Sequence, residues 1–175
     1  MGQEIERRFL VRDPRILDGR VGKRIVQGYV AKESGAMTTR VRIHGDHGYL
    51  TLKGPRQGLV RDEFEYPIPV DDAWRIVLEH CGNRVIEKTR YLVEHIDQVF
   101  EVDVFEGRHT GLIIAELELS HERQAFTLPP WIGEEITGDK RFGNFCLALF
   151  EGPVRPEDRP ATFSPALRPH LPAMH

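Results

Sequence analysis

Charged side chains recur at every second position in several segments of the chain, beginning with Glu4, Glu6 and Arg8. In a β-strand, alternate side chains share one face, so charges two residues apart point the same way. The pattern therefore predicts strands with one charged face and one mainly apolar face. The later members of the series are Arg40, Arg42, Lys53, Arg61, Glu63, Glu65, Lys88, Arg90, Glu101, Asp103, Glu116 and Glu118.

Two pairs of acids in this series suit a divalent metal. Glu4 and Glu6 lie on the first expected strand, and Glu116 and Glu118 lie near the last. Carboxylates are hard oxygen ligands of the kind that Mg²⁺ and Mn²⁺ prefer. A single Glu-x-Glu pattern is common on exposed strands, whereas two such pairs facing a cluster of arginines are more specific. The acids therefore predict a metal site.

The bases in the series suit phosphate. Arg40, Arg42 and Arg90 can each bind oxygens with two N–H groups at once, whereas Lys53 and Lys88 act as compact cations. No glycine-rich nucleotide loop of a known type is present, so side chains must grip the phosphates. A ligand with several phosphates and a bridging metal is the natural partner for so many cations.

About eight strands are expected to position these residues, and most of their connections are short. Their ranges are 3–11, 24–32, 38–44, 48–54, 61–68, 84–93, 98–105 and 112–119. The segment 44–48 is typical of a hairpin turn because of its glycines and aspartate. The number of antiparallel strands favours a mainly β member of the α+β class, either a sandwich or a closed or partly open barrel with helices outside.

The apolar spacing also predicts helices. One is capped by Asp71 or Asp72 and stops at Gly82, a second runs over 139–150, and a shorter one begins at Ser120. The apolar stripes of the two main helices are Trp74, Val77, Leu78 and Cys81 in the first, and Phe142, Phe145, Cys146 and Leu149 in the second. Both helices are expected to cover the apolar face of the strands.

Two interpretations of the charged strand face remain open from its period alone. It can be a solvent-facing surface with cross-strand ion pairs, each worth less than about 1 kcal/mol. Alternatively, the two helices cover the apolar face from outside a barrel, and the charged face lines the interior. Such an interior must be wet and must hold compensating charges, because unpaired buried charge is costly.

Composition narrows the class of protein. The 175 residues fit one domain over 1–150 and a tail over 151–175, which carries six prolines and is expected to be extended or disordered. A net charge of -3 gives no general attraction for nucleic acid or an anionic membrane, and no long apolar run is present. Cys81 and Cys146 lack metal-like spacing, so a cytoplasmic protein with reduced, buried thiols is the simplest interpretation.

A series of ordered motifs resembles the CYTH superfamily, also called triphosphate tunnel metalloenzymes, over about residues 2–150. The motifs are EIERRFLV at the start, then QGYV, TRVRI, YLTLKG, RDEFEYPIP, IEKTRY, FEVDVFEG, AELELS and EEITGDKRFGN. The resemblance implies an eight-stranded antiparallel tunnel that binds triphosphates with a divalent metal. Among its members, the chain looks most like the short bacterial enzymes that hydrolyse inorganic tripolyphosphate.

The resemblance also implies a role for each matching position. Lys53 and Tyr29 match a dyad that activates water. The expected neighbours Arg40, Arg42 and Lys88 would lower the pKa of Lys53. Asp103 and Glu101 either hold a second metal or, as we favour, pair with Lys88 and Arg90. The metal ligands would be Glu4, Glu6, Glu116 and Glu118, and the triphosphate would contact Arg8, Arg40, Arg42, Lys53, Lys88 and Arg90.

One position departs from the family pattern, in which the first motif ends in lysine where this chain has Arg8. Arginine keeps the charge but cannot act as a base, so activity survives only if the position binds phosphate. Lys53 also has a simpler alternative role, in which it only contacts phosphate while a metal-bound water attacks.

Three functions stay open at this stage. The leading one is a Mg²⁺-dependent tripolyphosphatase; the others are an adenylate cyclase or thiamine triphosphatase of the same superfamily, and a non-catalytic binder of polyphosphate or nucleotide. The retained acid pairs argue against the binder, because anion binding alone does not need them. Exposed strand edges in an incompletely closed barrel would allow a homodimer.

Overall fold

The computed structural model describes residues 2–30 and 37–149. The expected tail over 151–175 lies outside the described residues. Within them, no helix is long and apolar enough to cross a membrane. In chain order, the elements are β1 (Gly2–Val11), η1 (Pro14–Leu17), β2 (Lys23–Tyr29), β3 (Thr38–His44), β4 (His47–Lys53), β5 (Val60–Ile68), α1 (Val70–His80), β6 (Val85–His95), β7 (Gln98–Phe105), η2 (Gly107–His109), β8 (Ile113–Glu118), β9 (Ile132–Glu135), η3 (Lys140–Phe142) and α2 (Asn144–Leu149).

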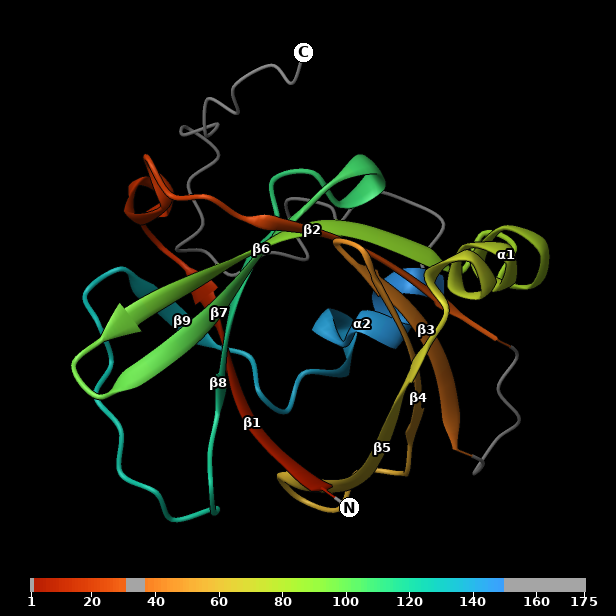
Figure 1. Ribbon diagram of the computed structural model, residues 1–175. Coiled ribbons are helices and arrows are strands. Elements are labelled where there is room, and N and C mark those ends of the chain that lie inside the picture. Colours follow the sequence, from red (N-terminus) through yellow and green to blue (C-terminus); the bar gives the residue numbers. More distant parts are fainter. Residues whose placement is uncertain (1, 31–36, 150–175) are drawn as a thin grey trace.

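The strands form an antiparallel barrel (Figure 1). Hydrogen-bonded neighbours follow the order β5-β4-β3-β2-β6-β7-β8-β1, and the pairing of β5 with β1 closes the ring. Gly45, with φ of 60°, makes the tight turn between β3 and β4, as the glycine pattern predicted. The expected eight-stranded barrel is therefore confirmed.

The strand β1 is the seam of this barrel. Its first residues pair with β5, with Glu4 opposite Arg61, while its middle pairs with β8, where Glu6 lies opposite Glu118 and Arg8 opposite Glu116. The closure thus brings the first and last acid pairs of the sequence onto adjoining strands. A ninth strand, β9, pairs with the end of β1 and was not expected, because its four residues show no clear alternation.

Helix α1 covers the outer face of β2, β3 and β4. Val77 and Cys81 pack there against Val26, Val41 and Ile43. The prediction that Trp74 and Leu78 belong to the buried apolar stripe is wrong, since Trp74 is 37% exposed and Leu78 is 75% exposed. The helix lies flat on the sheet, so only a narrow stripe one turn apart is buried. The residue before the helix is Pro69, which has no capping side chain, so the expected aspartate caps are wrong as well.

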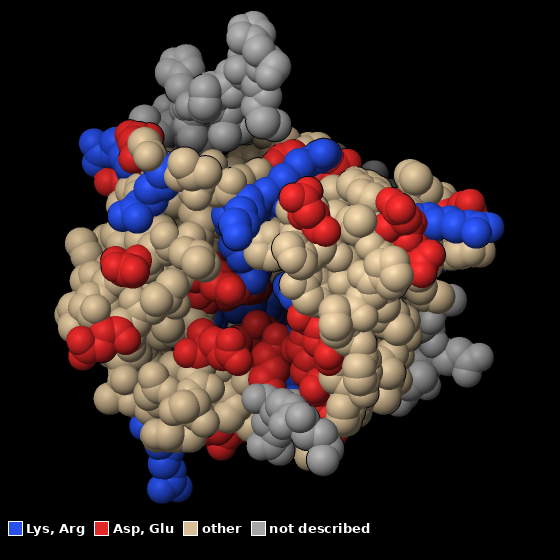
Figure 2. Space-filling view, in the orientation of Figure 1, with Lys and Arg blue, Asp and Glu red and all other residues tan. Residues whose placement is uncertain are grey.

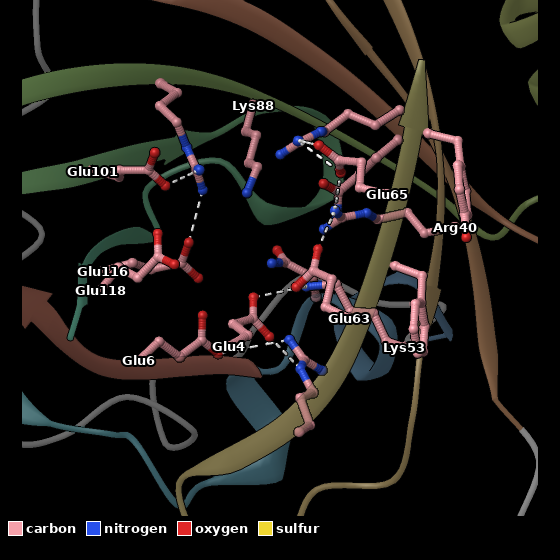
Figure 3. A pocket seen from close by; sticks show the side chains of 17 residues that line it. Glu4, Glu6, Arg40, Lys53, Glu63, Glu65, Lys88, Glu101, Glu116 and Glu118 are labelled. Atoms are coloured by element: carbon pink, nitrogen blue, oxygen red, sulfur yellow. Dashed lines mark hydrogen bonds and ion pairs between the residues drawn. The ribbon is translucent and has the colours of Figure 1, made fainter. Parts of the chain in front are cut away.

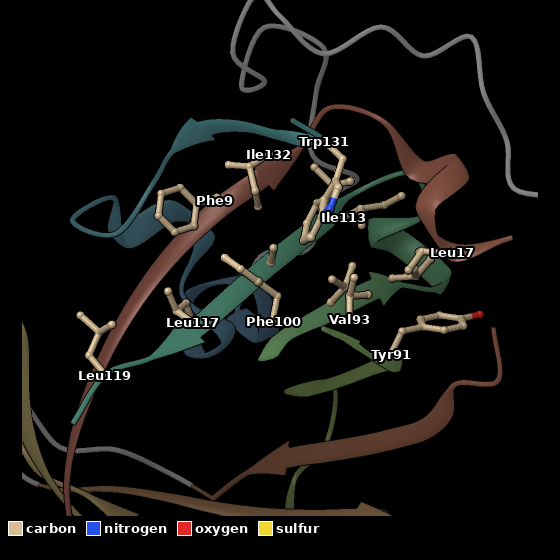
Figure 4. Close-up of a cluster of buried hydrophobic side chains, with 14 of the residues drawn as sticks. Phe9, Leu17, Tyr91, Val93, Phe100, Ile113, Leu117, Leu119, Trp131 and Ile132 are labelled. Carbon is tan, nitrogen blue, oxygen red and sulfur yellow. The ribbon is translucent and has the colours of Figure 1, made fainter. Parts of the chain in front are cut away.

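A second apolar layer covers the outer face of β1, β6, β7 and β8 (Figure 4). Phe9, Val93 and Phe100 lie at its centre, and Trp131 and Ile132 close it from outside. The ring of Phe100 meets Trp131 edge to face at 5.3 Å between centroids, a favourable geometry. The cover on this side is therefore a loop and β9 rather than a helix.

The short helix expected at Ser120 is not formed. Instead, the Ser120 backbone N–H and hydroxyl both donate to Gln124 Oε1, at 2.6 and 2.8 Å. Side-chain bonds of this kind compete with helical hydrogen bonds and favour turns. The segment then continues without regular structure to Trp131, whose side chain packs in the outer apolar layer.

Helix α2 closes one end of the barrel, and this corrects its expected place outside. Phe142 and Leu147 pack against Leu10, Ile86 and Ile114, which continue the inward-facing positions of their strands. Figure 1 accordingly shows α2 within the outline of the strands. The expected continuous helix over 139–150 is also wrong.

Gly143 is the reason for the shorter helix. Its backbone is extended, with φ of -69° and ψ of 134°, and it separates η3 from α2. Of the two cysteines expected to be buried, Cys81 is buried, but Cys146 is exposed on α2. Leu149 is 49% exposed too, so half of the expected apolar stripe is wrong. Phe142 is buried and Phe145 partly buried, because the segment closes a barrel end instead of lying along a sheet.

Gly28 is required where α1 approaches β2. A Cβ at this position would lie 2.5 Å from Cys81 Sγ and 2.9 Å from Cys81 Cβ. We predict that Gly28→Ala lowers the free energy of unfolding by about 1–3 kcal/mol, because the helix must shift. Urea denaturation measures the loss, and Gly138→Ala is the matched control, since its added Cβ meets nothing within 4 Å. Equal stability of both variants would contradict the close packing.

Candidate functional site

The barrel encloses a cavity of about 520 Å³ whose lining is mainly charged, here called the charged chamber. Acidic side chains gather around its opening and basic atoms lie deeper (Figure 2). The charged strand face therefore points inward, and the alternative of a solvent-facing sheet is wrong. The predicted site residues that line the chamber are Glu4, Glu6, Arg40, Arg42, Lys53, Lys88, Arg90, Glu116 and Glu118 (Figure 3).

Glu4 lines the chamber and links β1 to β4 and β5. Its carboxylate accepts from Lys53 Nζ on β4 at 2.8 Å and from Arg61 Nε on β5. Burial by itself would raise the pKa of Glu4, but Lys53 and Arg61 lower it far below its usual range. Glu4 is therefore firmly ionised, and its charge is already shared between two bases.

Lys53 is a buried base whose pKa is shifted in opposite directions by its surroundings. Its ammonium lies 2.8 Å from Glu4 and 2.9 Å from Glu63. Burial lowers the pKa of Lys53, Arg40 and Arg61 lower it further, and the two glutamates oppose this. The expected lowering is thus present, although burial is its largest cause and Arg61, rather than Arg42 or Lys88, is the second neighbouring cation.

Asp103 holds the two bases of β6 in place. Lys88 Nζ donates to Asp103 Oδ2, while Arg90 donates to Asp103 Oδ1 and Oδ2, both at 2.6 Å. Arg90 also donates to Glu116 at 2.7 Å and to Glu101. The favoured ion pairing of Asp103 and Glu101 is therefore confirmed. Both oxygens of Asp103 are used by these bases, so its alternative role as a metal ligand has no support in the geometry.

Arg40 and Arg42 are oriented by acids on β5. Arg40 Nη2 donates to Glu65 at 3.1 Å and to Thr51 Oγ1 at 3.1 Å, and Arg42 Nη2 donates to Glu65 at 2.9 Å. The Nε atoms of both arginines are buried without a hydrogen-bond partner among the described residues. Unpaired buried donors are costly, so these two guanidiniums are prepared for a further acceptor.

The remaining carboxylates carry more negative charge than their neighbours balance. Burial, together with Glu116 and Glu4, raises the pKa of Glu6, while burial and nearby acids, Glu101 first, raise the pKa of Glu118. Glu118 has no hydrogen bond or ion pair within the described part of the chain. Crowded carboxylates of this kind fit a divalent cation, which would relieve their repulsion.

No ready-made metal cage is present, however. Across residues 2–30 and 37–149, no group of three or more His, Cys, Asp or Glu side chains is arranged to hold a metal ion. Glu6 instead accepts from Arg56 Nη2 at 2.7 Å. Mg²⁺ commonly uses only one or two carboxylates and completes its shell with water and phosphate, so these acids still fit it.

Arg8 and Tyr29 do not line the charged chamber but a second cavity, of about 410 Å³, on the α2 side of the barrel. Arg8 donates from Nη1 to the Phe142 carbonyl at 2.9 Å and from Nη2 to the Thr137 carbonyl at 3.3 Å. Tyr29 Oη accepts from Gln27 Nε2 at 3.0 Å, and burial raises the pKa of Tyr29 to about 12. Lys53 lines this cavity too, but no described hydrogen bond joins it to Tyr29, so their dyad stays a prediction.

Sequence reasoning gave no role to three residues that the structure places at the site. Arg61 belonged to the charged series, but its position opposite Glu4 depends on the closure of the barrel. Arg56 lies on the loop between β4 and β5, where no period marks it. Asn144 lines both cavities from the start of α2. Its only signal was its place in the last matching motif.

The closed barrel has bases inside it that suit a multiply charged anion, and crowded carboxylates that suit a cation. The sequence matches the CYTH domain family over residues 2–143. The chain therefore belongs to the CYTH domain family.

Relatives with curated names share most of its length. An inorganic triphosphatase of Acetivibrio thermocellus is 43% identical over 147 residues, which cover 84% of this chain and 94% of the relative. An inorganic triphosphatase of Nitrosomonas europaea is 40% identical over 150 residues, covering 83% and 97%. The crystal structure of an inorganic triphosphatase superposes with a TM-score of 0.64 at 38% identity, covering 87% of this chain and 98% of that one.

Two neighbouring acids are expected to affect stability in opposite directions. Because the pKa of Glu6 is raised in the fold, its ionisation costs stability at neutral pH, and the cost disappears below the unfolded pKa of about 4.3. Glu4 has a lowered pKa, so its stabilisation is present above about 4.3 and is lost as the pH falls further. We predict that Glu6→Gln stabilises the protein at pH 7 in EDTA and that Glu4→Gln destabilises it.

Urea denaturation from pH 7 down to pH 3 measures both effects. The Glu6→Gln difference should vanish towards pH 3, where Glu6 is protonated in both the folded and the unfolded protein. The Glu4→Gln difference should shrink only in part over this range, because Glu4 is protonated in the unfolded protein but stays ionised in the fold. Destabilisation of the Glu6→Gln variant at pH 7 in EDTA would show that Arg56, Arg8 and Arg61 already neutralise this acid.

Proposed function

We propose that this protein hydrolyses inorganic tripolyphosphate to pyrophosphate and phosphate with the help of Mg²⁺, or of Mn²⁺ in its place. One observation carries the proposal: in a chain 40–43% identical to two inorganic triphosphatases, the barrel interior presents oriented arginines and crowded acids to the same chamber. A linear anion with several charges satisfies the arginines, and a cation satisfies the acids.

Glu6, Glu116 and Glu118 are the residues that would hold the metal. Glu4 lies two residues from Glu6 on β1 and would add negative charge beside the metal. When bound, the metal supplies charge neutralisation for the phosphate oxygens and a site for water of lowered pKa. The crowding that raises the pKa of Glu6 and Glu118 supports this assignment. Asp103 is left out, because both of its oxygens accept from Lys88 and Arg90.

The bases of the chamber would bind the phosphates. Arg40 and Arg42 have unpartnered Nε donors among the described residues, and Lys88 and Arg90 face them from β6. Fixed donors of this kind stabilise the charge that develops on phosphoryl oxygens without having to reorganise. Arg8 is directed to backbone carbonyls near α2, so it would contact substrate only at that end of the barrel.

Lys53 is the residue best placed to take a proton from water. A lysine base needs a pKa below its ordinary value, and burial together with Arg40 supplies the shift. The neutral form would accept the proton as the water oxygen bonds to the terminal phosphorus. The bridging P–O bond then breaks, and pyrophosphate leaves with the electron pair. Tyr29, with a pKa of about 12, would assist only as a neutral hydroxyl.

The substrate is tested by incubating the purified protein with tripolyphosphate, ATP or thiamine triphosphate, each with Mg²⁺ and with EDTA. We expect phosphate release from tripolyphosphate, at least tenfold faster than from the organic triphosphates and abolished by EDTA. Among the described residues that line the chamber, most are charged and only Phe64 and Tyr66 are aromatic, so an organic group finds little apolar surface. Formation of cyclic AMP from ATP, or tight binding without turnover, would overturn the proposal.

The role of Lys53 is tested by its pH dependence. If its neutral form takes the proton, kcat should rise with pH and level off at the lowered pKa of Lys53, below the model-lysine value of about 10.4. Lys53→Arg keeps the charge but cannot lose its proton, so we expect substrate binding to persist, kcat to fall by about 10²-fold or more, and the rising limb to vanish. A rising limb that persists in this variant would assign the ionisation to another group.

A further inference from the structure

Asn144 lies where the two cavities of the barrel meet. Five of the described residues line both cavities, namely Glu6, Arg40, Lys53, Arg61 and Asn144. Four of them are charged, and Asn144 alone is neutral. Its position follows from α2, which closes the barrel end and begins at this residue. A side-chain amide is therefore placed between the carboxylate-rich chamber and the second cavity.

The amide oxygen of Asn144 is buried and has no hydrogen-bond partner among the described residues. Leaving a buried polar atom unpaired costs free energy, so native proteins rarely keep one without a reason. No hydrogen bond within the described chain satisfies the rest of this side chain either. Asn144 lines both cavities, so a rotation of this unheld amide brings its oxygen to space that a ligand or a water molecule can occupy.

The short helix that carries Asn144 is held firmly, even though six residues are too few to be stable alone. His109 Nε2 lies 2.8 Å from the Leu147 carbonyl, and Arg108 Nη2 donates to the Ala148 carbonyl at 2.9 Å. Before the helix, Arg8 donates to the Phe142 carbonyl. These contacts fix both ends of the segment, so the backbone that carries the amide is held in one position.

We propose that Asn144 contacts the reacting end of the substrate, donating an amide N–H to the terminal phosphoryl group and accepting from the water that attacks it. An amide is suited to this task because it donates and accepts at once without changing charge, and glutamine orients water in this way in GTPases. The inference rests on the proposed function. It adds that the terminal phosphoryl group lies beside Lys53, where the two cavities meet.

In this mechanism Asn144 positions the attacking water, and Lys53 accepts its proton. The water oxygen forms a bond to the terminal phosphorus, its proton passes to neutral Lys53, and the bridging oxygen leaves with pyrophosphate. Asn144 takes no proton in this sequence. Its loss should therefore reduce the rate without moving the pH at which kcat levels off, which distinguishes it from Lys53.

The test compares Asn144→Ala and Asn144→Ser with the parent protein. Serine is well tolerated at a helix start, so it keeps the fold if alanine does not, yet its hydroxyl is too short to replace the amide. Binding of diimidotriphosphate with Mg²⁺ is measured by calorimetry, and steady-state hydrolysis of tripolyphosphate is measured across pH. Asn83→Ala, on an exposed turn between α1 and β6, is the matched control.

We expect both Asn144 variants to bind the analogue about tenfold more weakly, the loss of one hydrogen bond to a charged acceptor. We also expect kcat to fall by 10²-fold or more with an unchanged pH profile, while Asn83→Ala behaves as the parent. Unchanged binding and kcat in the variants would overturn the role of Asn144 alone. If the parent binds the analogue but does not hydrolyse tripolyphosphate, the proposed function fails, and the binding comparison still decides the Asn144 contact. Failure of the parent to bind would overturn both.

Discussion

Compensation of buried charge is the constraint on which the rest of this structure depends. The side chains of Lys88 and Asp103 are each 1% exposed, and such a pair persists only because its members and Arg90 satisfy one another. Removing one partner of a buried pair typically costs about 3–5 kcal/mol, since the other charge is left without compensation. The strand register meets this constraint at some positions by placing a base opposite an acid, as with Glu4 and Arg61 on the closing strands, but it also leaves Glu6 opposite Glu118.

A charged interior contributes little net stability, so the apolar faces outside the barrel must supply it. The attraction between paired buried ions roughly offsets the free energy lost when they leave water, whereas burial of apolar surface stabilises the fold. This explains the two outer layers, with α1 against Val41 and Ile43 on one side and Trp131 against Phe100 on the other. At the α2 end the inner face turns apolar, at Leu10 and Ile114, because the helix excludes water there.

The period of two in the sequence was sufficient to predict the strands, their charged face and most residues of the chamber, because alternation is a local property. What it could not predict depends on closure. Arg61 has a role only because β5 meets β1, and Phe142 is buried because α2 enters the barrel end. The failed helix at Ser120 reflects side-chain bonds to Gln124 that compete with the helical pattern.

The same compensation implies that anion and cation binding are coupled. In the protein alone, Arg40 and Arg42 pair with Glu65, Arg90 pairs with Glu116, and Arg56 pairs with Glu6. A phosphate chain that takes these bases leaves their carboxylates uncompensated, and a cation that takes the carboxylates leaves the bases uncompensated. Each ligand therefore removes a cost that the other creates, and by linkage each raises the affinity for the other. The balance of signs inside the barrel thus favours a metal–polyphosphate complex over either ion alone.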